Sequence, residues 1–308
     1  MPRKNLIRGL VGHILLASAI GYLLWSVHND AGGMLRLLFD VNPVSWLGSV
    51  FAFMAMSLAQ SVYHSMVLSA LAGNFSRSRS LHDVAAYLQA QIVRYLPGKV
   101  WGVLYQADKS RDRHSSVRIV AANVWQAIVT NLLSIGVSAS FLSLSLYSSY
   151  FWLILIFLLS VILIEMLHRD NPILRGMKSL LCSVGFMNDF INTIPSVNLR
   201  WAGSFVLLLE WVFFSMGVAF FAGQFLSVGA IIVTIGWYAI SSILAVVAVL
   251  VPAGLAVREA IFVGGHEILG ESSQRLLLLA AQVRLSMVMA EVAIAGIVAF
   301  VANRRTCE

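Results

Sequence analysis

The chain has 308 residues, of which 59% are hydrophobic and 11% are charged. Soluble domains carry about 25% charged residues, so this composition excludes a soluble globular protein and indicates a polytopic α-helical membrane protein. The formal net charge of +7 does not indicate nucleic-acid binding. Lysine and arginine gather in short segments beside apolar runs, as the positive-inside rule describes.

Apolar runs follow one another along the chain, and most approach or exceed the about 20 helical residues that a bilayer core requires. The predicted spans are Leu10–Val27, Val44–Leu71, Val117–Leu146, Phe151–Leu167, Trp201–Leu226, Val228–Val251 and Leu276–Val301. The first run follows basic residues, as in a signal peptide, but it is long for one, so we expect a retained span. The basic segments place both termini on the cytoplasmic side of the inner membrane.

The stretch YLPGKVWG, from Tyr95 to Gly102, interrupts this pattern. Basic residues flank it on both sides, which predicts that both flanks lie in the cytoplasm. Pro97 disfavours helical geometry at the residue before it, so the helix breaks there. We therefore expect a helix over 81–96 and a short second arm over 99–106, which together form a re-entrant hairpin that does not cross.

The second half contains a similar break in VPAGLAVREAIFVGGHE, from Val251 to Glu267. Pro97 and Pro252 are 155 residues apart, and the same shift places the predicted span at Val44–Leu71 on 199–226. Paired interruptions at matching positions are typical of transporters with inverted repeats. We expect one membrane domain with repeats over 1–149 and 150–308, about six full spans and two hairpins. An alternative is that Val228–Val251 spans unaided.

Each break starts a new helix, whose free N–H groups and positive dipole end suit an anion. Lys99 lies at the first break, with Arg94 one turn earlier, and Arg258 lies near the second. Two such helix starts with cationic side chains favour a lipid phosphate. The alternative is that Lys99 and Arg258 reach out to the nearest headgroup layer.

Three charged residues lie inside predicted spans, where charges are rare and usually functional. Glu210 is near the middle of its span, and Arg284 and Glu291 share one face of the last span, two turns apart. They are candidates for a gate or a proton relay. The alternative is a structural ion pair, of Arg284 with Glu210 or with Glu291, that only fixes packing.

Polar faces within the spans are weaker candidates. Gln60 and His64 are four residues apart, and Asn123, Gln126 and Thr130 recur at helical spacing. We expect such groups to form hydrogen bonds between helices. Glu165 lies at a span end and is expected at the membrane interface. The two cysteines, Cys182 and Cys307, predict neither a disulfide framework nor a metal site. No cofactor and no enzymatic motif is predicted.

At RYLPGKVWG and VPAGLAVREA the chain resembles the transmembrane, flippase-like module of lysylphosphatidylglycerol synthases, as a free-standing member without the aminoacyltransferase domain. The resemblance rests on the residues of two motifs and covers nearly the whole chain. These residues are Arg94, Pro97 and Gly98 in the first motif and Pro252, Gly254, Arg258 and Glu259 in the second. Ala256 stands where the family usually has glycine. The resemblance implies a lipid translocation module and assigns these residues, with Lys99, to the substrate site.

The sequence therefore predicts a flippase-like translocase, not an enzyme, for an anionic phospholipid or a polyprenyl-phosphate-linked saccharide in the cytoplasmic membrane. One alternative is a scaffold that docks a glycosyltransferase or other envelope enzyme through the basic segment Lys109–Arg118. The other is an integral-membrane enzyme that uses Glu210, Glu259 or Glu291 as acid or base. Lipid movement, enzyme co-purification and product formation distinguish the three.

Overall fold

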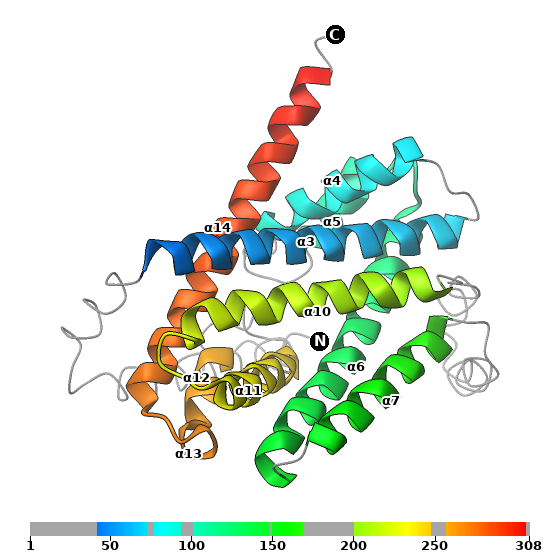
Figure 1. Ribbon diagram of the computed structural model, residues 1–308. Coiled ribbons are helices and arrows are strands. Elements are labelled where there is room, and N and C mark those ends of the chain that lie inside the picture. Colours follow the sequence, from blue (N-terminus) through cyan, green and yellow to red (C-terminus); the bar gives the residue numbers. More distant parts are fainter. Residues whose placement is uncertain are drawn as a thin grey trace, which may run out of the picture.

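The regular secondary structure is entirely helical in the part of the chain that the structure describes (Figure 1). The computed structural model describes residues 42–72, 77–93, 101–147, 150–168, 200–247 and 257–305. The helices in chain order are α3 (Pro43–Ala72), α4 (Arg77–Val93), α5 (Trp101–Lys109), α6 (Ser116–Tyr147), α7 (Tyr150–His168), α10 (Arg200–Ala222), α11 (Val228–Val247), α12 (Val257–Gly264), α13 (His266–Leu269) and α14 (Ser273–Arg305). The predicted all-α class is confirmed.

Among the described residues, five helices are long and apolar enough to cross a membrane, namely α3, α6, α10, α11 and α14. The shorter α7 is apolar as well. All six begin within three residues of the predicted starts. Helix α10 ends before its predicted end Leu226, at Ala222, where Gly223 and Gln224 form a turn toward α11. The predicted end of α11, Val251, lies outside the described residues. The predicted span Leu10–Val27 lies outside the described residues.

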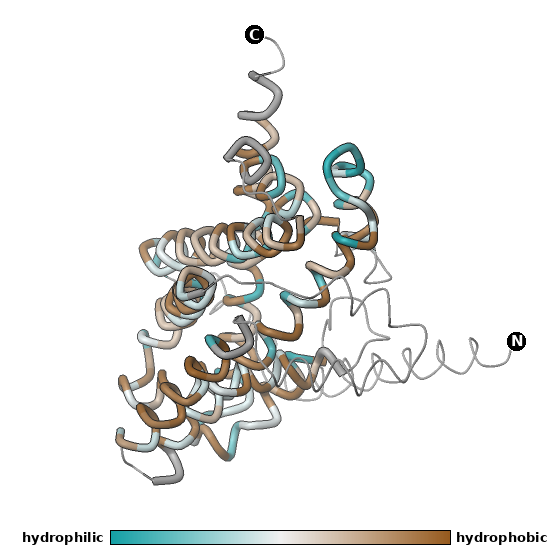
Figure 2. The backbone as a smooth tube through the Cα atoms, turned by 90° about the vertical axis from the view of Figure 1, so that its right-hand side faces the viewer, coloured by the Kyte–Doolittle hydropathy of each residue, from teal (hydrophilic) through white to brown (hydrophobic). Residues whose placement is uncertain are grey.

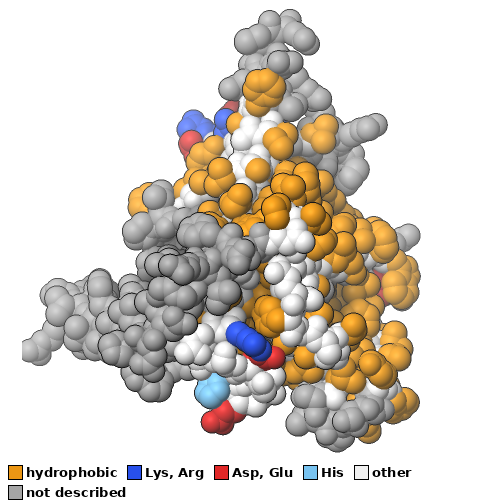
Figure 3. Space-filling model, turned by 60° about the vertical axis from the view of Figure 1, so that its left-hand side comes forward, with side chains coloured by type: hydrophobic (Ala, Val, Ile, Leu, Met, Phe, Trp, Pro, Cys, Tyr) orange, Lys and Arg blue, Asp and Glu red, His pale blue; other side chains and the backbone are white. Residues whose placement is uncertain are grey.

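The outward surface of these helices is apolar, which suits contact with lipid. On α7, large apolar side chains such as Phe151, Leu158 and Ile162 are exposed. Hydrophobic residues run along most of the tube in Figure 2. In Figure 3, hydrophobic side chains cover much of the described surface, and only a few charged ones are visible. Five membrane-length apolar helices with such a surface indicate a polytopic membrane protein.

Helices α3 and α10 form the longest described contact of the bundle and run side by side in Figure 1. Ser49 Oγ donates a hydrogen bond to the backbone oxygen of Gly217, and Gln60 Nε2 donates to Glu210 Oε1. Rising residue numbers on α3 thus pair with falling numbers on α10. The two helices are therefore antiparallel.

Two glycines allow α3 and α10 to approach closely. A Cβ atom on Gly217 would lie 2.6 Å from the ring of Phe53, and one on Gly48 would lie 2.6 Å from the ring of Phe220. Each glycine on one helix thus accepts an aromatic ring from the other. Small residues at contact points are the usual means of packing helices in a membrane, where lipid removes the hydrophobic drive.

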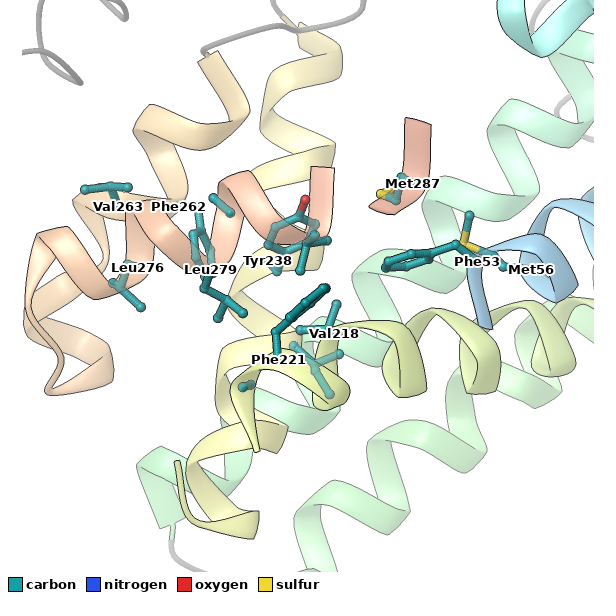
Figure 4. Close-up of a cluster of buried hydrophobic side chains, with 14 of the residues drawn as sticks. Phe53, Met56, Val218, Phe221, Tyr238, Phe262, Val263, Leu276, Leu279 and Met287 are labelled. Carbon is teal, nitrogen blue, oxygen red and sulfur yellow. The ribbon is translucent and has the colours of Figure 1, made fainter. Parts of the chain in front are cut away.

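Two clusters of buried apolar side chains lie along α3. The first cluster contains Phe53 and Met56 of α3 with residues of α10, α11, α12 and α14 (Figure 4). The second cluster contains Tyr63, Val67 and Leu68 of α3 with residues of α6, α7 and α10. Helix α3 therefore holds both halves of the bundle together.

The described helices of the two chain halves correspond in order. Shifted by the 155 positions that separate Pro97 from Pro252, the residues of α3, α4, α5 and α6 would fall on 198–227, 232–248, 256–264 and 271–302. These ranges overlap α10, α11, α12 and α14. The packing also corresponds, because α4 packs on α14 as α11 packs on α6.

Candidate functional site

A buried ion pair lies at the start of α12, where one half of the predicted anion site was expected. Arg258 Nη2 donates to Glu259 Oε1 over 2.8 Å, and the two side chains are only 11% and 12% exposed. The Arg258 guanidinium also lies 4.9 Å from the ring centroid of Tyr238 on α11. This cation–π contact ties the short helix to the longer helix before it.

The pairing changes what Arg258 can do. Its guanidinium is already paired, because Glu259 accepts a hydrogen bond from it. Glu259 Oε2 is buried and has no hydrogen-bond partner among the described residues. An incoming phosphate would compete with this carboxylate for Arg258. A bidentate guanidinium is well suited to such an exchange, since carboxylate and phosphate fit the same donor geometry.

Glu210 lies at the centre of the α3–α10 contact. Gln60 Nε2 donates to its Oε1 over 2.8 Å, and the residue is 8% exposed. Within the described part of the chain, its Oε2 is buried and has no hydrogen-bond partner. A carboxyl group in this position is held by one amide of the facing helix α3, so any movement of α3 against α10 alters its environment.

The two charged residues in the middle of α14, Arg284 and Glu291, lie at different depths in the bundle. Glu291 is 2% exposed, whereas Arg284 is only partly buried. Helix α14 packs on α3, α4, α10 and α12. The shared face of Arg284 and Glu291 thus belongs to a helix that contacts both halves of the chain.

Six of the predicted site residues lie outside the described residues: Arg94, Pro97, Gly98, Lys99, Pro252 and Gly254. The structure brings Arg258 and Glu259 together. It joins Glu210 to Gln60, a residue that the sequence analysis assigned only to helix contacts. No group of three or more metal-ligating side chains occurs among the residues that the structure describes.

A buried polar cluster joins α3, α4, α5 and α6. We call it the His64 cluster, and it consists of His64, Tyr87, Gln106, Asn123 and Gln126. Its hydrogen bonds between helices were predicted for His64, Asn123 and Gln126. Thr130 instead bonds the backbone of its own helix, at Gln126 O. Tyr87 and Gln106 were missed, because α4 and α5 both carry several other polar residues, so neither side chain stands out from its neighbours in the sequence.

Two further polar contacts differ from expectation or were not foreseen. Glu165 was expected at the membrane interface, but it is 4% exposed and accepts a hydrogen bond of 2.8 Å from Ser204 on α10. Its interfacial position stays a prediction, and the buried partner Ser204 was not foreseen. Asp83 of α4 binds His114, whose Nε2 lies 3.1 Å from both carboxylate oxygens. This buried pair fastens α4 to the segment between α5 and α6.

One described cavity of about 270 Å³ lies between α6, α11 and α13. It is lined by Leu144, Gly229, Ala230, Val233, Ile268 and Leu269. Ligand sites combine apolar walls with a few convergent polar side chains. This cavity has no polar side chain in its lining, so it does not suit a lipid headgroup.

The comparisons with known proteins give no relative for this chain. No protein-family model matches the sequence, and no curated protein matches it significantly. The function is therefore inferred from the geometry of the described residues.

Proposed function

We propose that this protein is a lipid translocase, related to the flippase-like module of lysylphosphatidylglycerol synthases. It moves an anionic phospholipid or a lipid-linked saccharide between the leaflets of the cytoplasmic membrane. The main support is the ordered correspondence of α3, α4, α5 and α6 with α10, α11, α12 and α14 at one offset. The antiparallel contact of α3 with α10 supports an inverted relation between the halves.

Inverted repeats with interrupted helices hold the substrate between the repeats in many secondary transporters. In this proposal the headgroup binds between the start of α5, with Arg94 and Lys99, and the start of α12, with Arg258. The acyl or prenyl tail stays in the bilayer. The phosphate displaces Glu259 from the guanidinium of Arg258, so the ion pair forms when the site is empty and opens when it is occupied.

The charged residues inside the bundle form the gate. Glu210 lies between α3 and α10, the two corresponding helices, and is held by Gln60. Rocking one repeat against the other changes this contact. Arg284 and Glu291 on α14 complete the gate or relay a proton, because their helix contacts α3 and α4 of the first half and α10 of the second.

Leaflet accessibility in proteoliposomes tests this function. The substrates are a labelled phosphatidylglycerol and a labelled polyprenyl-phosphate sugar, each compared with protein-free liposomes. Arg258→Ala should abolish protein-dependent movement. Arg275→Ala is the matched control, because Arg275 also pairs with a glutamate, Glu271, but is 61% exposed. Equal transport by wild type and Arg258→Ala would refute the site, and no transport of either lipid by wild type would refute the function for these classes.

A scaffold role is the second candidate, and one observation favours it. Lys109, Arg111 and Arg113 are exposed beside Asp108 and Asp112, at the end of α5 and in the segment that follows it. Exposed mixed charges provide a docking surface for an envelope enzyme such as a glycosyltransferase. Charge reversal of these three residues should release a co-purifying enzyme and leave lipid movement unchanged if docking is their role.

A further inference from the structure

The His64 cluster is buried within the half of the bundle that contains the second apolar cluster. His64 is fully buried, and Gln106 and Gln126 are 1% and 5% exposed. The ring of Tyr87 stacks on the imidazole with centroids 4.5 Å apart. Both imidazole nitrogens have amide partners, and this arrangement fixes the protonation state of His64.

The partner of Nδ1 is Gln126. The Gln126 Nε2 atom contacts the backbone oxygen of Gln60 at 3.2 Å, and a backbone carbonyl can only accept a hydrogen bond. The amide nitrogen of Gln126 is therefore turned toward Gln60, and its Oε1 faces His64 at 2.8 Å. Nδ1 of His64 must then hold a proton and donate it.

The partner of Nε2 is Gln106 on α5. Asn123 Nδ2 also binds the backbone oxygen of Ile119, so this atom is the amide nitrogen and donates to Gln106 Oε1 at 2.9 Å. The Gln106 Nε2 atom consequently points at His64 Nε2, 2.5 Å away, and donates to it. Nε2 of His64 must therefore be unprotonated. The cluster accepts only the neutral imidazole with its proton on Nδ1.

A second proton on His64 breaks one side of this arrangement. Nε2–H would then point at the amide hydrogens of Gln106, and neither group could accept. Rotation of the Gln106 amide would turn its oxygen toward His64. Its amide nitrogen would then face Asn123 Nδ2, and two donors would meet there. In either case α5 loses a buried hydrogen bond to α3 or α6. A buried unmatched donor is costly, so separation of α5 becomes favourable.

Other titratable and charged groups surround His64. Asp83 and Tyr87 lie on the same face of α4, one turn apart, and Asp83 is already bound to His114. Tyr63 is adjacent on α3, and Glu210 lies beyond Gln60 on α10. Helix α6 contributes only the amides of the cluster. Helix α14, which packs on α3 and α4, holds Arg284 and Glu291.

We propose that His64 is a proton-binding latch that holds α5 against α3 and α6 when neutral and releases α5 when a proton binds Nε2. Helix α5 is the arm that follows YLPGKVWG, so release of α5 moves the predicted Lys99 site. This consequence rests on the proposed translocase, whereas the latch itself does not.

The distance between two spin labels tests the latch without any lipid substrate. One label is placed on α5 at Leu104→Cys and the other on α6 at Ile135→Cys, positions that are 54% and 51% exposed. Cys182 and Cys307 are first replaced by serine. The full chain in nanodiscs is measured at about pH 7.5 and about pH 4, because the cluster resists the second proton and the lower value must lie well below the ordinary histidine pKa of about 6.5.

In wild type we expect a longer distance component at the lower pH only. His64→Gln keeps one donor and one acceptor but cannot gain a charge, so its distance should stay short at both values. Gln106→Glu should also stay short, because a carboxyl group at position 106 bonds Nε2 with the proton on either atom. This second variant decides the question if His64→Gln fails to fold.

An unchanged wild-type distance overturns the latch, as does a wild-type response in His64→Gln or in Gln106→Glu. A response that persists in His64→Gln and disappears in His114→Gln assigns the proton to His114 instead. Lipid movement measured at the same two pH values separates the two proposals. A pH-dependent distance without transport leaves the latch standing and removes the translocase.

Discussion

Replacement of Gly217 by alanine should destabilise the contact between α3 and α10. The added Cβ atom would lie 2.6 Å from two ring atoms of Phe53, whereas ordinary contacts begin at 3.4 Å. The ring must therefore retreat by nearly 1 Å. Phe53 is fully buried within the first apolar cluster and has little room to move. Overpacking of this kind costs about 1–3 kcal/mol.

Gly296→Ala is the matched control for this change. Gly296 also lies in a long apolar helix, but no atom lies within 4 Å of its added Cβ. Both variants gain the same helix propensity, which is up to about 1 kcal/mol in water. The difference between them therefore isolates the clash. We expect Gly217→Ala to be less stable than Gly296→Ala by about 1–3 kcal/mol.

The free energy of unfolding in mixed micelles with increasing SDS measures this difference. Phe53→Leu removes the two clashing ring atoms, so the double variant Gly217→Ala/Phe53→Leu should lose less stability than the sum of its parts, by at least about 0.5 kcal/mol. Equal stability of Gly217→Ala and Gly296→Ala would contradict the clash with Phe53. Additive effects of the changes at positions 217 and 53 on the free energy of unfolding would contradict it as well.

Three further outcomes follow from the polar contacts. Gln60→Leu should lower the free energy of unfolding by about 1–3 kcal/mol, because it leaves the Glu210 carboxyl without its donor. Adding Glu210→Leu to the same chain should recover part of this loss. Additive effects of the two changes on the free energy of unfolding in SDS would contradict the contact. Asp83→Ala should increase amide hydrogen exchange in residues 110–114, because it removes the partner of His114; unchanged exchange would contradict the clamp. Burial, and then the nearby Arg113 guanidinium, lowers the pKa of His82, so the unfolded chain gains a proton that the folded chain resists. The contribution of His82 to stability is then full above about pH 6.5 and falls as the pH drops toward the lower folded-state pKa. The free energy of unfolding, measured at about pH 7.5 and about pH 5.5, should therefore fall less in His82→Gln than in wild type.

The order and type of the helices could be predicted from the sequence because hydrophobic length is a local property. A run such as Val228–Val251 is apolar over its whole length, and no partner is needed to recognise it. The short helix that follows Pro97 was also predictable, since proline acts on its own neighbours. The start of α5 at Trp101 is close to the expected second arm.

The partners of the polar residues could not be predicted from the sequence, because they are set by contacts between distant segments. Glu210 was expected to be functional on account of its depth, but its bond to Gln60, 150 positions away, depends on the close packing that Gly48 and Gly217 allow. Arg258 was expected to face an anion, which stays a prediction, and its hydrogen bond to Glu259 was not foreseen.

The sequence by itself determined that this is a helical membrane protein, where its described helices lie and that a short helix follows Pro97. These features depend on the cost of polar groups in lipid and on the backbone geometry of single residues. The tertiary structure alone decided which protonation state His64 has. Its two ring nitrogens contact the side-chain amides of Gln106 on α5 and Gln126 on α6. Only the packing of these helices against α3 fixes which amide atom faces each nitrogen.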